Sequence, residues 1–554
     1  MSRNPYNSRS KRPRAPARLV NPVPSSPIHL VPACGPEIAK LFSSGLAHHR
    51  AGRLGEAERI YRRILELDAQ HADSLHLLGM VAFQTGNCDA AAELISRAIL
   101  KHGQDAMYFS NLGNVLQMQG RLEESVHCYR KALVLNPGSA PAHGNLGLAL
   151  QFLGRLEEAA ESFERALELD PGIAVAHNNL GNVRQAQGRL EEAVACHERA
   201  LAVEPMNSEV YSNLGSVFDL QGKVPESVAS YDRALALKPD FAVALFNRSL
   251  LRLLMGDLAA GLPDYERRWH LSKRRSFSQP QWCGQPLDGA RILLYPEQGL
   301  GDTVQFLRYV PMVQAAGGQV ILEVQPQMRR LAARLPGVVE LSCSGEPLPP
   351  FDWHCPLMSL PLAFGTTLDT IPARVPYLTI PQAADAMCGL PGEGCGLRVG
   401  IAWAGSPAHL RDRFRSIPLE LLKPLFGLAG AQFFSLQLGP AAEELEEAGS
   451  PVGVIDLAPE IEDMADTAAL IAKLDLVIAV DTAVAHLAGA LGKPVWVMLP
   501  LVPDWRWLLD REDSPWYPTM HLFRQSRLGD WASVVEAVRC ALQKEIANNL
   551  ASRS

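Results

Sequence analysis

An acid, a hydroxyl and an imidazole lie close together in the segment 474–496, LDLVIAVDTAVAHLAGALGKPVW. Its apolar first half predicts a strand that ends at Asp481, and a helix pattern begins directly afterwards. Free backbone N–H groups at 482–484 would favour an anion such as a diphosphate. Thr482 would add a hydroxyl donor, and His486 a proton or a hydrogen bond. The alternative is structural: Asp481 or Thr482 caps the helix, and His486 is a partly buried helix residue.

A glycine-rich turn, EQGLGD, follows the predicted strand 291–295. Gly299 and Gly301 would permit close approach of the backbone to a ligand. The last glycine of a dinucleotide-binding fingerprint is replaced by Val304, so the turn does not favour NAD binding. Asp302 starts the following helix, where it is either a general base at the edge of a cleft or an N-terminal helix cap.

A third polar cluster follows the predicted strand 397–403, in the segment GIAWAGSPAHLRDRFRSIPLELL. Ser406 lies where this strand ends, and Arg411 and Arg415 follow it. Arginines so close to the end of a strand can clamp phosphate oxygens, although a solvated loop is the simpler interpretation for Arg411. No Asp-x-Asp pair is obvious in these segments, and a helix terminus with an arginine can replace a metal. We therefore expect no metal ion and no cofactor.

These three segments lie where predicted strands and helices alternate, which predicts parallel sheets. One βαβ unit has strand 291–295, helix 302–316 and strand 319–324. A second series starts at strand 397–403 and continues through helix 418–429, strand 432–437, helix 463–473, strand 475–480, helix 483–491 and strand 494–498. The two starts predict two Rossmann-like lobes that face a cleft.

The first half of the chain repeats with a period of 34 residues, which is the length of one tetratricopeptide (TPR) unit. Glycines mark the period at Gly52, Gly86, Gly120, Gly154, Gly188, Gly222 and Gly256. A second glycine column, Gly45 to Gly215, predicts close packing of the two helices of a unit. The units run 38–71, 72–105, 106–139, 140–173, 174–207 and 208–241, and a degraded seventh covers 242–271. The array resembles the TPR family, whose members bind peptides or proteins.

Asparagine recurs in this register at Asn111, Asn145, Asn179, Asn213 and Asn247. An amide both donates and accepts, so a ladder of amides on the concave face can hold an extended peptide backbone. A similar ladder occurs in the TPR part of O-GlcNAc transferase. The alternative is that these asparagines only support hydrogen bonding within the helices.

The GLGD and DTAVAHLAGALG segments resemble the lipopolysaccharide heptosyltransferase-like family over about residues 290–545. That resemblance implies a GT-B fold, with Asp302 as the base that deprotonates the acceptor. It also implies a nucleotide-sugar site, whose expected residues are Gly301, Ser406, Arg415, Asp481, Thr482, Ala483 and His486. The chain departs from the family at Ala483, where glycine is usual, and Arg415 takes the place of a phosphate-binding lysine. The arrangement also looks like bacterial TPR-glycosyltransferase fusions, which agree with the chain at Trp516–Pro518 and Leu522–Gln525.

The expected fold class is therefore an all-α TPR superhelix followed by a GT-B fold of two Rossmann-like lobes. The expected domains are a disordered basic tail (1–36), the TPR array (37–271), a linker (272–289), the N-terminal lobe (290–390), the nucleotide-sugar-binding C-terminal lobe (391–545) and a tail (546–554). The basic tail is either an electrostatic tether or simply solvated.

The composition of the chain argues against several classes of function and location. The 554 residues carry a net charge of −7, which does not indicate bulk nucleic-acid binding. The ten cysteines form no close pair, no apolar run is long enough to span a bilayer, and no secretory signal is evident, so we expect a cytoplasmic protein. The expected function is transfer of a sugar from a nucleotide-diphosphate sugar to a hydroxyl, with the array recruiting a protein acceptor or partner. The alternative is a TPR interaction scaffold whose glycosyltransferase-like domain is inactive.

Overall fold

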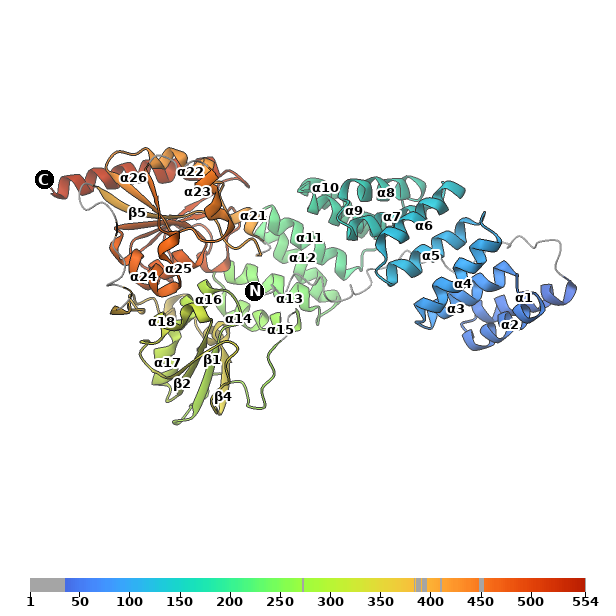
Figure 1. The fold of residues 1–554 in the computed structure, drawn as a ribbon, viewed down its shortest axis with the longest axis horizontal. Helices are drawn as coiled ribbons and strands as arrows, with labels where there is room; N and C mark the ends of the chain where they lie inside the picture. Colours follow the sequence, from blue (N-terminus) through green and yellow to red (C-terminus); the bar gives the residue numbers. More distant parts are fainter. Residues whose placement is uncertain are drawn as a thin grey trace. The chain divides into compact units, whose positions relative to one another are not determined.

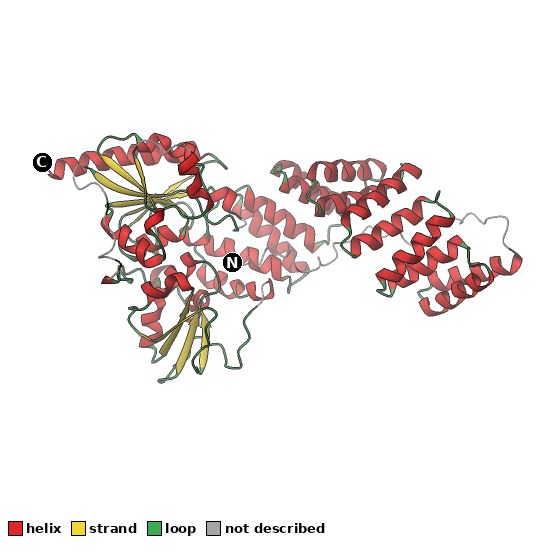
Figure 2. Cartoon of the chain, viewed as in Figure 1, coloured by secondary structure: helices red, strands yellow, loops and turns green. Residues whose placement is uncertain are grey.

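The structure, a computed structural model, describes residues 35–271, 274–382, 384, 390, 396–408, 411–447 and 453–553. Two compact units are distinguished among them. The first comprises the described residues up to Leu220 with Ala236–Pro239, and the second comprises Gln221–Leu235 and the described residues from Asp240 onward. Figure 2 shows helices throughout the first unit and both helices and strands in the second. Almost all of the expected basic tail lies outside the described residues.

The first unit consists of helices that follow one another as antiparallel pairs (Figure 1). They are α1 (Pro36–Arg50), α2 (Leu54–Leu67), α3 (Ala72–Gln84), α4 (Cys88–Lys101), α5 (Ala106–Met118), α6 (Leu122–Leu135), α7 (Ala140–Phe152), α8 (Leu156–Leu169), α9 (Ala174–Ala186), α10 (Leu190–Val203) and α11 (Ser208–Leu220). From α3 onward, each pair starts at the residue where the 34-residue period predicts a new unit. The N-terminal region is therefore an array of TPR helices.

The two glycine columns have different physical roles. The seven glycines that mark the period all have positive φ angles, between 74° and 87°, at the turn between the helices of a pair. Glycine adopts this conformation without steric cost. In the other column, a Cβ added at Gly113 on α5 would lie 2.6 Å from the ring of Tyr129 on α6. Glycine thus lets the two helices of a pair approach until an aromatic ring of one touches the backbone of the other.

The last repeat belongs to the second unit. Its helices are α13 (Ala242–Leu254), α14 (Leu258–Tyr265) and α15 (Arg268–Leu271), and most of α12 (Val224–Leu237), the second helix of the sixth repeat, belongs to the same unit. Arg268 donates hydrogen bonds of 2.8 Å to the carboxylate of Glu297 and 2.8 Å to the hydroxyl of Ser359. The Arg268 and Glu297 side chains are only 6% and 7% exposed. The seventh unit, which the sequence predicts as a terminal repeat, is therefore packed into the α/β part.

The segment expected as a linker also packs against the α/β part. Gln281 forms a parallel bridge with His354, and the N–H of Trp282 donates to the His354 carbonyl at 2.9 Å. Trp282 and Leu287 are almost completely buried. The polar composition of 272–289 is therefore interrupted by two apolar anchors, which fix the described part of this segment to the first lobe.

The first lobe is built on a parallel sheet with strand order β3-β2-β1-β4 (Figure 1). Its strands are β1 (Arg291–Tyr295), β2 (Gln319–Val324), β3 (Val338–Cys343) and β4 (Trp353–Pro356). The connection from β1 to β2 contains α16 (Leu300–Phe306), the 3₁₀ turn η1 (Leu307–Tyr309) and α17 (Val310–Ala315), in place of the single helix expected over 302–316. Helices α18 (Arg329–Ala332) and α19 (Leu360–Ala363) and the turns η2 (Pro326–Met328), η3 (Leu357–Ser359) and η4 (Leu368–Thr370) follow β2 and β4.

The second lobe has a parallel sheet with strand order β10-β9-β8-β5-β6-β7. Its strands are β5 (Leu397–Ala402), β6 (Ala431–Ser435), β7 (Val454–Asp456), β8 (Leu476–Val480), β9 (Val495–Leu499) and β10 (Met520–Arg524). Its helices are α21 (Asp412–Arg415), α22 (Leu419–Phe426), α23 (Glu443–Glu447), α24 (Met464–Lys473), α25 (Ala483–Ala490) and α26 (Trp531–Arg553), with turns η5 (Pro440–Ala442), η6 (Ala458–Glu460) and η7 (Trp505–Trp507).

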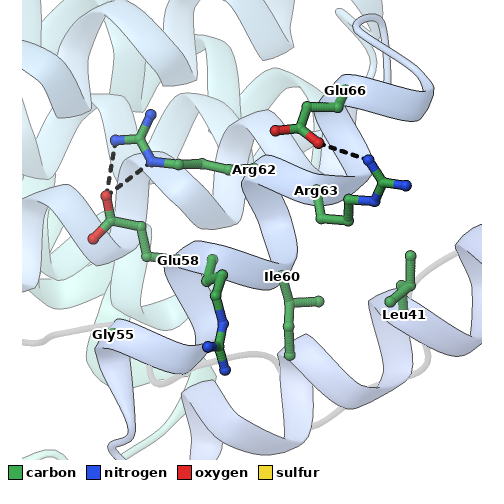
Figure 3. Close-up of a pocket in the computed structure, with 8 residues that line it drawn as sticks. Leu41, Gly55, Glu58, Ile60, Arg62, Arg63 and Glu66 are labelled. Atoms are coloured by element: carbon green, nitrogen blue, oxygen red, sulfur yellow. Dashed lines mark hydrogen bonds and ion pairs between the residues drawn. The ribbon is translucent and has the colours of Figure 1, made fainter.

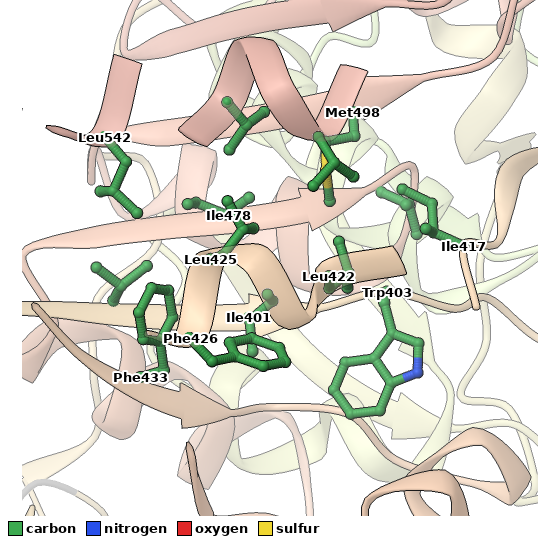
Figure 4. Close-up of a cluster of buried hydrophobic side chains, with 14 of the residues drawn as sticks. Ile401, Trp403, Ile417, Leu422, Leu425, Phe426, Phe433, Ile478, Met498 and Leu542 are labelled. Carbon is green, nitrogen blue, oxygen red and sulfur yellow. The ribbon is translucent and has the colours of Figure 1, made fainter. Parts of the chain in front are cut away.

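One face of this sheet is covered by α22 and α26, and its core is shown in Figure 4. Ile401, Phe433 and Ile478 of the strands meet Leu422 of α22 and Leu542 of α26 there. Helix α26 continues to Arg553, so the residues expected as a C-terminal tail from 546 extend that helix. Among the described residues, none of the helices is long and apolar enough to cross a bilayer. The C-terminal half is thus an α/β structure with two parallel sheets, as the alternating pattern predicts.

Candidate active site

The glycine-rich turn after β1 holds Asp302 in a defined position. Asp302 is the third residue of α16, and its Oδ2 accepts a hydrogen bond of 2.9 Å from the N–H of Gly299. Its other oxygen, Oδ1, is paired with the guanidinium of Arg506. The Asp302 side chain remains 21% exposed. The carboxylate therefore caps its helix and also faces a cation from the second lobe.

Arg506 is a buried cation that the sequence did not single out. It lies in η7, and its side chain is 7% exposed. Besides Asp302, it binds Asp504, whose Oδ1 accepts from Nη1 at 2.7 Å. Burial alone would lower the pKa of Arg506, but the charges of Asp504 and Asp302 raise it above its ordinary value. Arg506 is therefore charged, and its buried Nε has no hydrogen-bond partner among the described residues.

The strand–helix junction of the second lobe is formed as the sequence predicts. Strand β8 ends at Val480, Asp481 follows, and Thr482 is the N-cap residue of α25. The Thr482 hydroxyl donates to the carbonyl of Val480 at 3.3 Å and does not cap the helix. His486 lies in the second turn of α25, and its Nε2 is 3.7 Å from Oδ1 of Asp481. Thr482 is thus near the start of α25 with its hydroxyl turned toward the strand.

Asp481 remains ionised despite its burial. Burial would raise the pKa of this carboxyl, but the interaction with His486 and the positive charges of Arg415 and Arg506 hold it well below its usual range. A buried carboxylate among cations is expensive to form and is most often found where charge is needed. The junction therefore presents a fixed negative charge beside an imidazole.

The two sequence motifs meet in the second unit. Helix α16 packs against α25, and a Cβ added at Gly301 would lie 2.9 Å from Cδ2 of His486 and 3.4 Å from Cα of Ala483. The close approach of these two helices therefore depends on glycine at 301. With the Arg506–Asp302 ion pair, this contact brings Asp302 near the Asp481–His486 pair although the chain separates them widely.

Of the polar residues predicted after β5, only Arg415 acts on this site. Arg415 ends α21 and pairs with Asp412, with Nε 3.3 Å from Oδ1. A Cβ added at Gly405 would lie 2.5 Å from Nη2 of Arg415, so this glycine makes room for the guanidinium. The charge of Arg415 acts on Asp481, as described above, whereas Ser406 is exposed. Arg415 thus contributes electrostatically, and no described contact connects Ser406 to the other predicted residues.

Two motifs without a predicted role also support the site. In the WYP segment, the Tyr517 hydroxyl lies 3.0 Å from Nδ1 of His486. In the LFRQ segment, Arg524 donates to the carbonyls of Trp507, Leu508 and Arg511 at 2.6, 2.9 and 2.8 Å. Leu508 has a positive φ of 53°, a strained conformation for this residue. Arg524 therefore stabilises the irregular turn that follows Arg506.

Three of the five predicted asparagines bond to a neighbouring repeat. Nδ2 of Asn111 lies 2.9 Å from His76, and Nδ2 of Asn145 and Asn213 donates at 3.0 Å to Asn114 and Asn178. Asn111, Asn145 and Asn179 are buried, and Asn213 and Asn247 are partly buried. These hydrogen bonds connect consecutive repeats, which adds a stacking role to the two that the sequence suggests.

A groove on the first repeat lies apart from the predicted residues (Figure 3). Its volume is about 620 Å³, and Leu41, Gly55 and Ile60 form part of its lining. Two of its arginines pair along α2, Arg62 with Glu58 at 2.8 Å and Arg63 with Glu66 at 2.8 Å. Arg59 also lines the groove, which therefore has one more positive than negative side chain, and none of the predicted site residues lines it.

Comparison with known families agrees with this architecture. Residues 48–112, 104–171 and 172–240 match tetratricopeptide repeat families, and residues 436–497 match glycosyltransferase family 9 (heptosyltransferase). The last match includes α24, β8 and α25, and therefore Asp481, Thr482 and His486. The chain thus carries TPR repeats in its N-terminal region and a glycosyltransferase family 9 domain in its C-terminal part. These matches support glycosyl transfer in general and protein interaction by the repeats.

Among curated proteins, the chain is 30% identical to Protein FlbA of Caulobacter vibrioides over 326 residues. The match covers 54% of this chain and 54% of that protein, so the chain spans about half the length of its relative. A solved structure of MamA shares 25% identity over 29% of this chain and 94% of that chain, with a TM-score of 0.28. YrrB, described as a TPR protein with an unusual peptide-binding site, shares 19% identity over 34% of this chain and 98% of its own, with a TM-score of 0.31.

Proposed function

We propose that this protein is a GT-B glycosyltransferase that moves a sugar from a nucleotide-diphosphate sugar to a hydroxyl group. In the reaction, the acceptor oxygen forms a bond with the anomeric carbon, and the bond from that carbon to the diphosphate breaks. Asp302 takes the hydroxyl proton, and the diphosphate leaves with the negative charge. General-base catalysis of this kind contributes roughly 10²–10⁴ in rate.

The diphosphate would bind at the start of α25. Backbone N–H groups there, with Thr482 and His486, are the proposed donors, and Gly301, Ser406 and Ala483 are proposed to line the nucleotide sugar. Arg415, which acts electrostatically on Asp481, would balance the charge that develops on the leaving group. Because a helix terminus and an arginine can supply this stabilisation, we propose that the reaction is independent of metal ions.

The observation that most supports this proposal is the meeting of α16 and α25. The family match covers His486, and the candidate base Asp302 lies one residue from Gly301, the glycine against which the His486 ring packs. Transfer of a sugar requires that donor and acceptor are held close together. A base from one lobe and an anion-binding junction from the other can do this. The TPR array would recruit a protein acceptor or partner in the cytoplasm, with the asparagine ladder as its proposed contact.

Calorimetric titration of the full chain with common nucleoside diphosphates tests the donor site. We expect one of them to bind, and His486→Ala and Thr482→Ala to weaken its binding severalfold. His521→Ala is the matched control, because His521 lies on β10 of the same lobe and packs against Phe523. If no nucleoside diphosphate binds the folded chain, the proposal is contradicted. Metal independence is tested separately, by adding EDTA to a turnover assay, which should leave the rate unchanged.

A second candidate function is that of a TPR interaction scaffold with an inactive glycosyltransferase-like domain. The observation that favours it is the state of Asp302, since each of its oxygens already has a partner, Arg506 or the N–H of Gly299. A scaffold would bind its partner protein normally and bind a nucleotide sugar without turning it over. Release of free nucleoside diphosphate in the presence of the partner separates the two functions.

A further inference from the structure

The imidazole of His486 is enclosed on several sides. Its ring is stacked on Trp507, with ring centroids 5.2 Å apart and an interplanar angle of 26°. On another side it packs against Gly301. The Tyr517 hydroxyl lies 3.0 Å from Nδ1, and Asp481 lies 3.7 Å from Nε2. Since His486 is only 5% exposed, these neighbours rather than water decide which ring nitrogen carries the proton.

The partners of Tyr517 indicate where its hydroxyl proton points. A second tyrosine, Tyr377, donates its own hydroxyl proton to the carbonyl of Val304 at 2.9 Å. The oxygen of Tyr377 accepts a hydrogen bond of 3.2 Å from Arg308, which is only a donor. The hydroxyls of Tyr377 and Tyr517 are 3.5 Å apart, at the limit of a hydrogen bond. Nδ1 of His486, which lies 3.0 Å from the Tyr517 hydroxyl, is therefore a better acceptor for its proton than the oxygen of Tyr377.

Tyr517 is held rigidly in this orientation. A Cβ added at Gly489 on α25 would lie 2.6 Å from Cδ1 of Tyr517, so the tyrosine ring lies directly against the helix backbone. The guanidinium of Arg308 lies 4.4 Å from the centre of the ring on another side and donates to the Trp516 carbonyl at 2.5 Å. Burial raises the pKa of Tyr517 well above its ordinary value. The hydroxyl therefore stays protonated at neutral pH.

We propose that Tyr517 is a positioning residue that donates its hydroxyl proton to Nδ1 of His486 and so keeps the ring proton on Nε2. His486 then presents an N–H donor on the side of the ring that faces Asp481. The role of this tautomer in binding rests on the proposed function. An Nε2–H group can donate to a diphosphate oxygen, whereas an unprotonated Nε2 would repel that oxygen. The tautomer itself is a property of the protein without any ligand.

Nitrogen NMR of the full chain labelled with ¹⁵N-histidine at pH 7.5 tests the tautomer directly. The His486 signals are assigned as those that disappear in His486→Gln. In the unaltered chain we expect a proton on Nε2 and none on Nδ1. Tyr517→Phe should change the Nδ1 signal and weaken binding of the tightest nucleoside diphosphate roughly three- to tenfold, which is the effect of one hydrogen bond. Tyr377→Phe, which removes a buried hydroxyl of the same cluster that does not contact the ring, should leave both unchanged.

A proton on Nδ1 in the unaltered chain, in either a neutral or a charged ring, overturns the proposal even if the Tyr517 variant fails to fold. Equal changes of the His486 signals in both tyrosine variants, or none in Tyr517→Phe, overturn it as well. Failure of the proposed function is a separate result. In that case no nucleoside diphosphate binds the unaltered chain, and the NMR spectra still decide the tautomer.

Discussion

The TPR repeats and the two α/β lobes both place glycine against an aromatic ring, but they bury different polar groups beside it. In the third repeat, Gly113 admits Tyr129, whose hydroxyl lies 2.7 Å from the amide oxygen of Asn114 and 3.1 Å from that of Gln117. In the lobes, Gly489 admits Tyr517, whose hydroxyl meets His486 in a cluster of ionised side chains. Close packing is common to both regions. The repeats also bury an arginine, Arg184 of α9, but a cluster of several buried charges lies in the region in which we propose chemistry.

Burying a charged side chain costs desolvation free energy, so a cluster of buried charges calls for a structural or functional explanation. In the repeats, the amides of Asn145 and Asn213 bond to amides of the preceding repeat, and the ion pairs lie mostly at the surface. The lobes bury Arg506 between Asp302 and Asp504, with Asp481 close enough to influence its charge. A buried ion pair seldom adds net stability compared with apolar residues. The difference therefore favours a functional reason for the cluster in the lobes.

The largest effect is expected from removing the proposed base. Asp302→Asn keeps the size of the side chain and its hydrogen bond to Gly299, but the amide cannot take a proton. We expect turnover of the nucleotide sugar to fall by roughly 10²–10⁴, with nearly unchanged donor binding. Asp504→Asn is the control, since Asp504 also pairs with Arg506 but is not a base in our proposal. Normal turnover by Asp302→Asn would remove Asp302 from the mechanism.

The second prediction concerns stability. Arg268→Ala leaves the carboxylate of Glu297 buried without its cation, and such a change costs about 3–5 kcal/mol of unfolding free energy. Arg62→Ala is the matched change in the repeats, because Arg62 and Glu58 form a pair that is 64% and 41% exposed. Exposed pairs contribute about 0–1 kcal/mol. Urea unfolding followed by circular dichroism compares the two variants, and equal losses would contradict the distinction between buried and exposed ion pairs.

The same variant has an expected pH dependence. Burial raises the pKa of Glu297, and Arg268 opposes that rise, so the pKa should rise further in Arg268→Ala. A carboxyl whose pKa is higher in the folded state binds protons more tightly when folded, so its folded state loses stability as the pH increases. The loss in Arg268→Ala should therefore be smaller at pH 5 than at pH 8. A loss that does not depend on pH would mean that Glu297 finds another partner.

The third prediction adds a methyl group to each glycine contact. Gly113→Ala and Gly489→Ala both place a Cβ 2.6 Å from a buried tyrosine ring, and overpacking of this kind costs about 1–3 kcal/mol. Only Gly489→Ala should also weaken nucleoside diphosphate binding, because it displaces the tyrosine that holds His486. A Cβ added at Gly55, near the start of α2, meets no described atom within 4 Å, so Gly55→Ala should not destabilise the chain. Thermal melts and titrations of the three variants measure both effects.

The elements that the sequence predicts well are periodic or continuously apolar. The 34-residue glycine columns repeat a local requirement, a positive φ or a close contact, so they mark each helix pair without any knowledge of distant residues. The apolar run before Asp481 similarly predicts β8, because a strand buried on both faces needs apolar side chains throughout. Strand β3 is not predicted, since the polar residues Glu340 and Ser342 interrupt its apolar pattern.

The site is predictable only where it is local. Asp302 and the 481–486 segment follow strands, so their positions can be expected from the βα pattern. Arg506 meets Asp302 across 204 residues and Arg308 meets Trp516 across 208, and no spacing rule connects such partners. One available signal was the composition of WRW, where two tryptophans flank an arginine just after an apolar strand. Aromatic rings around a cation favour a buried guanidinium.

The last prediction concerns the asparagine ladder. The triple variant Asn145→Ala, Asn179→Ala and Asn213→Ala removes amides in the middle of the array, away from its terminal repeats. If the ladder holds a peptide, each lost contact costs about 0.5–1.5 kcal/mol, and affinity for the partner protein falls about tenfold or more. If the amides only connect repeats, as the bonds of Asn145 to Asn114 and of Asn213 to Asn178 suggest, the melting temperature falls and affinity stays the same. A partner recovered from host lysate and identified by mass spectrometry provides the binding assay, and a thermal melt provides the stability. Unchanged affinity with a lower melting temperature would assign the asparagines to the packing that the repeats share, and donor binding at His486 should be unaffected in either case.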